Sequence, residues 1–424
     1  NLYGNQAGSF EGNAYFNSKV GKNWETTLLG HTKNNQIEND RNNDGFLDNP
    51  LTNHHIYRNQ WNYRSNRVHM ELGADFVSTR AVAGNLYLDS SLTPSSSEGE
   101  YRVEINTDKV GAFAKIGYLF PDDEFKSLAL QLNGTYTNQE AVFGIKNYSG
   151  LQKSAYANLI FQDEVGAKEN STESETENYY KTGISFQYDN VNESLLSEDP
   201  SFSMNGTYLI EEIVPGAYFE FTHSSKKVGL ITGVRADYSN IYGGFITPRV
   251  HLRYSFNNET VIKLMAGNGR RTPSLIMENV GLLASSRNWM LHPNSLNNSY
   301  RNNPYGLRQE ISWNFGGAFL KEFELFYREG SVHVDFYHTL FQNQLVVDLD
   351  QTAREVHFYN LDGQSVSNSL QLELNYELLK RLDIRVAYRY LDVYTNYSGQ
   401  LREKPLLSRH RGFVNLAYET KKKK

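Results

Sequence analysis

The sequence predicts an all-β protein, an antiparallel transmembrane β-barrel built from about seventeen strands. Three observations support this fold class. Apolar and polar side chains alternate in one segment after another, these segments are longer than the strands of soluble domains, and short connections alternate with long ones along the chain. No stretch approaches the roughly 20 apolar residues of a membrane helix, but that test does not detect strands in which only every second residue is apolar.

The alternation is clearest in residues 369–378. Apolar residues occupy one face and polar residues the other: Leu370, Leu372, Leu374 and Tyr376 against Gln371, Glu373 and Asn375. The same period of two, which is typical of a strand with one apolar face, recurs in residues 67–76, 127–136, 228–238, 249–256 and 382–390. Many segments reach about 10–15 residues, whereas strands of soluble domains average about 5–6 and a tilted membrane strand needs about 9–11.

The connections between these segments differ in length on the two sides. Short ones follow Val20, Arg64, His223, Phe256 and Glu377, and long ones lie near residues 38–53, 81–99, 191–205, 270–306 and 398–409. Outer-membrane barrels show this asymmetry, with short turns in the periplasm and long loops outside the cell. A set of soluble β-sandwiches is the alternative, because alternation does not say which face meets water.

The composition fits a barrel and excludes several kinds of site. Hydrophobic residues make up only 39% of the chain, yet it has 29 Tyr and 23 Phe. Disordered chains are poor in aromatic residues, so the chain is expected to fold. The absence of cysteine excludes disulfides, thiolate zinc sites and a cysteine nucleophile. A net charge of −6 does not favour nucleic acid as a partner.

Four arginines are expected to point into the lumen, namely Arg249, Arg253, Arg385 and Arg389, because each alternates with apolar neighbours. Two interpretations are open for them. They form a network with lumen carboxylates, or they contact a domain inside the barrel or an anionic substrate.

One long connection contains "DRNNDGFLD", residues 40–48, which resembles half of a calcium loop. An EF-hand is excluded because position 12 is Leu51 instead of Glu and both flanks are strand-like. A structural calcium ion could still bind through Asp40, Asn42, Asp44, the carbonyl of Phe46 and Asp48. The alternative is a turn rich in Asn and Asp with no ion.

Residues 266–289 read "AGNGRRTPSLIMENVGLLASSRNW". This segment resembles TonB-dependent outer-membrane receptors, particularly those of Bacteroidetes-type bacteria, in which a barrel strand ends in a G-x-G-x-R-T-like turn and leads into an E-N-x-G-L-L-x-S-S-R-like run. The residues singled out in this motif are Arg270, Arg271, Glu278, Asn279 and Arg287. They either give the loop its structure or contact a ligand. Segments 233–256, 358–378 and 404–420 look like further strands of the family, so the resemblance covers most of the chain.

The resemblance implies a barrel of the 22-stranded type, of which residues 1–424 are an incomplete part, with the N-terminal plug and some terminal strands outside them. It implies an outer-membrane location in a Gram-negative bacterium. The implied partners are membrane lipid, the protein's own plug, and TonB acting through the N-terminal region. The implied function is energised uptake of a scarce, large nutrient such as a ferric siderophore or cobalamin. No cofactor is required.

Two other functions are the alternatives. A passive porin or an adhesion barrel has the same strand pattern and lacks an encoded plug. An outer-membrane enzyme needs a catalytic set, and the sequence contains no G-x-S-x-G, H-E-x-x-H or P-loop motif. We therefore expect a transporter and not an enzyme.

Overall fold

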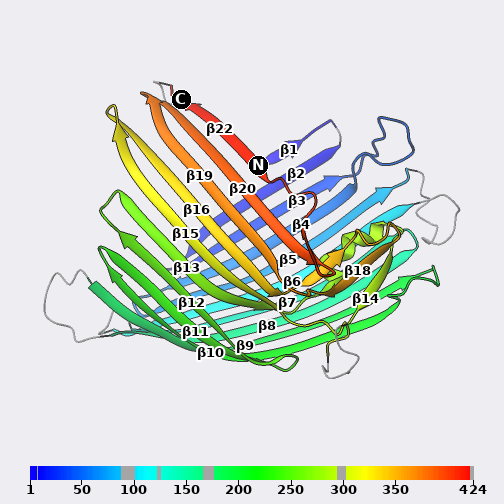
Figure 1. The fold of residues 1–424 in the computed structure, drawn as a ribbon, viewed down its shortest axis with the longest axis horizontal. Coiled ribbons are helices and arrows are strands. Elements are labelled where there is room, and N and C mark those ends of the chain that lie inside the picture. Colours follow the sequence, from blue (N-terminus) through cyan, green and yellow to red (C-terminus); the bar gives the residue numbers. More distant parts are fainter. Residues whose placement is uncertain (7, 87–100, 122–125, 166–175, 294–301, 421–424) are drawn as a thin grey trace.

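The computed structural model describes residues 1–6, 8–86, 101–121, 126–165, 176–293 and 302–420. Most of them form one 19-stranded antiparallel sheet that curves into a wall (Figure 1). Its strands are β1 (Leu2–Gly4), β2 (Ser9–Val20), β3 (Trp24–Asn35), β4 (Leu51–Arg64), β5 (Val68–Gly84), β6 (Arg102–Leu119), β7 (Ser127–Phe143), β8 (Lys146–Glu164), β9 (Thr176–Ser197), β10 (Gly206–Ser225), β11 (Val228–Ser239), β12 (Gly243–Ser255), β13 (Thr260–Arg271), β15 (Glu310–Leu325), β16 (Arg328–Asn343), β19 (Ser365–Leu379), β20 (Leu382–Tyr397), β21 (Gln400–Glu403) and β22 (His410–Tyr418).

The sheet is a meander in which each long strand pairs with the next long strand along the chain. The steps from β13 to β15, from β16 to β19 and from β20 to β22 skip only short elements. Apart from β1 and β21, which have 3 and 4 residues, the strands are 9 to 22 residues long. This confirms the predicted all-β barrel wall and its seventeen long strands.

The two faces of the wall differ as the alternation predicts. Leu372 lies in register with Val334 and Tyr388, and all three share the convex face. Gln371 lies in register with Asp335 and Arg389 on the concave face, which we call the lumen. Large apolar side chains are exposed along the convex face, among them Leu264, Phe315, Phe336 and Leu372. Such a face suits contact with lipid chains.

The wall has an edge strand at each end, β1 and β22. Within the described part of the chain, no backbone pairing joins β22 to β1 or β2. None of the described helices combines the length and the apolarity needed to cross a membrane.

The connections form two different rims. Turns of a few residues join β2 to β3, β4 to β5, β10 to β11, β12 to β13, β15 to β16 and β19 to β20, and we call this end the short-turn rim. At the opposite end, the long-loop rim, longer segments follow β3, β5, β9, β13, β16 and β20. The predicted asymmetry of the connections is therefore present.

The main apolar core lies at the long-loop rim. Two inserted segments build it against the ends of the wall strands. The first, after β13, contains helix α1 (Leu275–Asn279), 3₁₀ helix η1 (Val280–Ala284) and β14 (Asn288–His292); the second, after β16, contains β17 (Leu345–Asp348) and β18 (Glu355–Asn360). Strands β14, β18 and β17 form a small separate sheet near this rim (Figure 1). Trp289, Val356 and Phe358 of that sheet are fully buried.

One sequence expectation for this region needs correction. Residues 270–306 were expected to form a long irregular excursion, because Pro cannot donate to a strand ladder. In the structure β13 continues to Arg271, and residues 288–292 form a strand that pairs in parallel with β18. Alternation could not reveal this strand, because "NWMLH" has only 5 residues, of which Trp289 alone is fully buried. Residues 294–301 of the segment lie outside the described part of the chain.

Candidate functional site

The first inserted segment is fixed at both ends by Arg271, the last residue of β13. Its guanidinium donates two hydrogen bonds to Glu278 of α1, at 2.8 and 3.0 Å. It also donates to Glu310, the first residue of β15, at 2.9 and 2.6 Å. Planar guanidinium groups suit such paired contacts with carboxylates. Arg271 therefore joins the start, the helix and the end of the segment.

The other motif residues have separate contacts. The Asn279 amide donates to the Leu275 carbonyl at 2.8 Å, within the helix. Arg287 donates to the Leu349 carbonyl at 2.8 Å and so ties the first inserted segment to the second. The Arg270 guanidinium lies over the Phe245 ring, 5.0 Å from its centre. The motif residues do not converge on one point, and their contacts are those of loop structure.

A buried carboxylate anchors the first inserted segment to the wall. Glu193 of β9 has no exposed surface. It accepts hydrogen bonds from the Tyr148 hydroxyl at 3.0 Å and the Tyr305 hydroxyl at 2.6 Å. Burial, together with the neighbouring Glu193 carboxylate, raises the pKa of the Tyr305 hydroxyl, which therefore remains a donor. Sequence analysis missed this group because Glu193 and Tyr305 are 112 residues apart.

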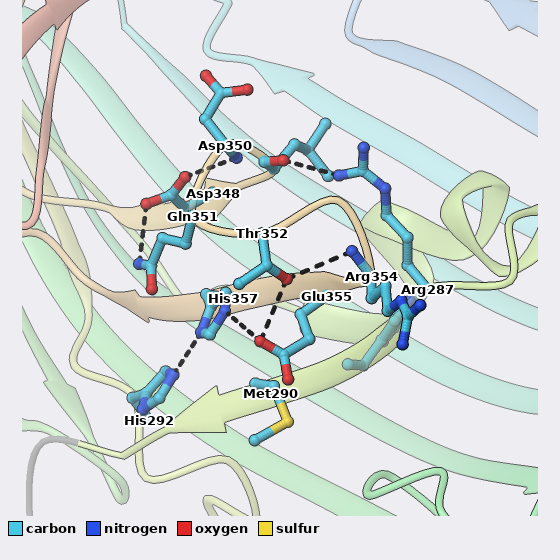
Figure 2. A network of polar contacts seen from close by, with 12 residues as sticks. Arg287, Met290, His292, Asp348, Asp350, Gln351, Thr352, Arg354, Glu355 and His357 are labelled. Atoms are coloured by element: carbon cyan, nitrogen blue, oxygen red, sulfur yellow. Dashed lines mark hydrogen bonds and ion pairs between the residues drawn. The ribbon is translucent and has the colours of Figure 1, made fainter.

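The small sheet carries a chain of polar contacts (Figure 2). His292 Nε2 and His357 Nδ1 lie 2.9 Å apart, and the two rings are stacked nearly parallel. His357 Nε2 lies 3.1 Å from the Glu355 carboxylate. The parallel pairing of β14 and β18 places His292 and His357 together. These polar contacts link β14 of the first inserted segment to β18 of the second.

A cavity of about 600 Å³ opens on the lumen below α1. Its lining combines charged, amide and aromatic side chains, including Tyr156, Asp189, Glu212, Arg235, Asn268 and Arg270. The carboxylates already have partners, because Glu212 accepts from Ser239 and Thr272 and Arg235 donates to Asp237. A cavity of this kind can bind a polar ligand through many hydrogen bonds without carrying one dominant charge.

The loop with the calcium-like pattern is closed by its own backbone. The N–H groups of Asp44 and Gly45 donate to the Asp40 carboxylate at 3.2 and 3.0 Å. The Phe46 N–H donates to Asp44 at 2.9 Å. The Arg41 N–H donates to Asp48 at 3.0 Å, and the amide of Asn42 donates to Asp44.

The contact from the Phe46 N–H to Asp44 is an Asx turn, and the other contacts close the loop around it. In the described ranges, no three His, Cys, Asp or Glu side chains are grouped to hold a metal ion. Calcium binding by this loop stays a prediction.

Comparison with known proteins identifies the architecture. A sequence model described as "TonB dependent receptor-like, beta-barrel" matches residues 2–422. No curated protein matches the chain. Among solved structures, the siderophore receptor PirA from Pseudomonas aeruginosa gives a TM-score of 0.62 at 11% identity, over 96% of this chain and 70% of that one.

Two further structures are similar. The outer membrane transporter YddB from Escherichia coli gives a TM-score of 0.65 at 11% identity, over 96% of this chain and 61% of that one. The Serratia marcescens hemophore receptor HasR, in complex with its hemophore HasA and heme, gives a TM-score of 0.64 at 10% identity. The match covers 97% of this chain and 68% of that one. This chain therefore spans 61% to 70% of the lengths of these three proteins. The match over nearly all of the sequence shows that the chain belongs to the TonB-dependent receptor β-barrel family.

Proposed function

We propose that this chain is the barrel wall of an outer-membrane importer that takes up a scarce, large nutrient such as a ferric siderophore or cobalamin. The observation that carries the proposal is the family match over residues 2–422. The similar structures include a siderophore receptor and a hemophore receptor bound to heme, which adds heme to the candidate cargoes. Uptake would be driven by TonB acting through an N-terminal plug that lies inside this wall.

The structure supports a selective wall better than an open pore. The inserted segments are packed by a buried core at the long-loop rim, and Arg271 and Glu193 hold the first of them to the wall. Below them lies the lumen cavity, with its balanced set of polar groups. A ligand that enters from outside would meet these fixed polar surfaces before it crossed the barrel.

Uptake by cells tests the proposal directly. The full-length protein is produced in a strain without its own copy, and uptake of radiolabelled ferric siderophore, heme and cobalamin is measured with and without a working TonB. We expect saturable uptake of one cargo that disappears without TonB or when the proton-motive force is collapsed. Uptake of small solutes that persists without TonB would instead identify a passive porin.

A matched pair of variants links transport to the inserted segment. Arg271→Gln removes the contacts with Glu278 and Glu310 and should reduce cargo binding, because the first inserted segment loses its fixed position. Lys227→Gln changes an exposed residue at the short-turn rim and should leave binding unchanged. Surface labelling of both variants corrects for the amount of assembled protein.

A further inference from the structure

Two pairs of basic residues face each other directly across neighbouring strands of the wall. Arg253 of β12 is in register with Lys263 of β13. Arg389 of β20 is in register with Arg411 of β22. Like charges placed directly opposite each other in an antiparallel pair are unfavourable. We therefore expect another interaction to offset the repulsion within each pair.

Both pairs belong to one row of the lumen face. From Lys263 the register runs through Ala318, Asp335 and Gln371 to Arg389. We call Arg253, Lys263, Arg389 and Arg411 the basic row. Between Arg253 and Arg411, Asp335 is the one carboxylate of this row, so this part of the row carries an excess of positive charge.

Several other lumen cations have carboxylate partners. Arg235 pairs with Asp237 at 2.6 Å, and Arg385 pairs with Glu373 at 2.8 Å. Arg249, which lies on the same strand and face as His251, forms an ion pair with Glu220.

In contrast, none of the four basic-row side chains makes a hydrogen bond or an ion pair with another described residue. These four side chains therefore lack the carboxylate partner that Arg235, Arg249 and Arg385 have.

A cavity of about 430 Å³ lies over the Arg253–Lys263 pair. His251, Met265, Gly316 and Tyr337 also line it. A Cβ atom on Gly316 would lie 2.8 Å from Met265 Cγ and from Tyr337 Cδ1, so a side chain here would force one of these two to shift. The two larger side chains close over Gly316, and the basic pair lies at the edge of the same cavity.

We propose that Arg253 and Lys263 form an oxyanion-binding site in the lumen, which takes a carboxylate or phosphate group. An oxyanion between two opposed cations removes their repulsion and gains charge-assisted hydrogen bonds. The group has two possible sources, the imported nutrient or an acidic side chain of the plug, and this choice rests on the proposed function. The chemistry that the site recognises is the same in both cases.

The test uses the full-length protein in detergent micelles, with inorganic phosphate as the probe. The melting temperature is measured with phosphate and with sodium chloride at equal ionic strength. The variants are Arg253→Gln, Lys263→Gln and the double variant that combines them. The charge-conserving Lys263→Arg is a fourth variant. Arg385→Gln, which removes a lumen arginine that already has a carboxylate partner, is the matched control.

A free site predicts that phosphate raises the melting temperature of the wild type, Lys263→Arg and Arg385→Gln by several degrees but not that of the double variant. A site filled by the plug predicts no phosphate effect and a double variant that melts several degrees below wild type. Both results support the inference. It is overturned if phosphate has no effect and the double variant melts at or above the wild-type temperature.

Failure of this inference can be separated from failure of the proposed function. TonB-dependent uptake is measured on the same preparations of cells. Normal uptake without any phosphate or charge effect would overturn the oxyanion site alone. A phosphate effect without energised uptake would overturn the transport proposal and leave the site.

Discussion

At the scale of single residues, the structure depends on buried charged groups and on the donors that contact them. Glu193 is fully buried at the long-loop rim and accepts hydrogen bonds from two tyrosines of different elements. A buried carboxylate without donors is costly, so its partners are expected to matter more than exposed ion pairs do.

Tyr305→Phe tests this carboxylate. The substitution keeps the ring, which stacks on Tyr208, but removes the donor at 2.6 Å. We expect a loss of about 1–3 kcal/mol in the stability of the inserted segment, measured by the rate of limited proteolysis in residues 302–309. Tyr254→Phe, which changes an exposed ring on the convex face, is the control. Equal proteolysis of the two variants would show that Glu193 does not need this donor.

The loop at residues 40–48 supplies a second residue-scale prediction. If calcium binds there, Asp44→Ala should abolish it, because Asp44 is one of the expected ligands and also accepts the Phe46 N–H. The variant should then be cut faster in residues 38–53, with no dependence on calcium, while the barrel still assembles. Glu38→Ala, in the same loop but outside the ligand set, is the control. Calorimetry that shows no calcium binding in the wild type would leave the loop as Asx turns.

At the scale of elements, one hairpin has an unusual turn. Phe326 and Tyr327 join β15 to β16 with φ values of 53° and 57°, and their side chains are 81% and 96% exposed. Two positive φ values define the turn that favours Asn-Gly, and a left-handed conformation costs other residues roughly 1–2 kcal/mol each.

We expect Phe326→Asn with Tyr327→Gly to stabilise the protein in detergent, measured as a higher temperature of loss of the compact, heat-modifiable form on gels. Asn258→Gly in the turn between β12 and β13 is the control, because neither Asn257 nor Asn258 has a positive φ that glycine would relieve. Lower stability would mean that the two aromatic side chains contribute more than the strain costs.

The small sheet has a predicted dependence on pH. Burial alone would raise the pKa of Asp348 in β17, but donors from Gln351, the Asp350 N–H and Tyr359 outweigh it and hold that pKa below its usual range. A lowered pKa means that the stabilisation is present at neutral pH and is lost as the pH falls through the folded-state pKa. Proteolysis of residues 345–360 should therefore accelerate in acid. Asp348→Asn should remove this pH dependence; an unchanged acid response would assign it to another group.

At the scale of the whole molecule, the sequence predicts what is periodic and misses what is not. Strands such as β19, which has 15 residues, were predicted because each face has its own polarity over residues 369–378. The small sheet and the contact between Glu193 and Tyr305 were not predicted, because they join short buried segments or residues far apart in the chain. The motif of residues 266–289 located the inserted segment and contains Arg271 and Glu278, which hold it, but it did not reveal their partner Glu310.

The orientation of the wall gives the last prediction. Leu372 lies on the convex face and Gln371 on the lumen face of the same strand, one residue apart. An arginine on the lipid side near the middle of the bilayer costs roughly 2–4 kcal/mol, whereas the lumen already holds Arg389 beside Gln371. Leu372→Arg should therefore reduce the amount of assembled barrel in the outer membrane far more than Gln371→Arg. Immunoblots of membrane fractions measure this amount, and equal losses for the two variants would contradict the assignment of the convex face to lipid.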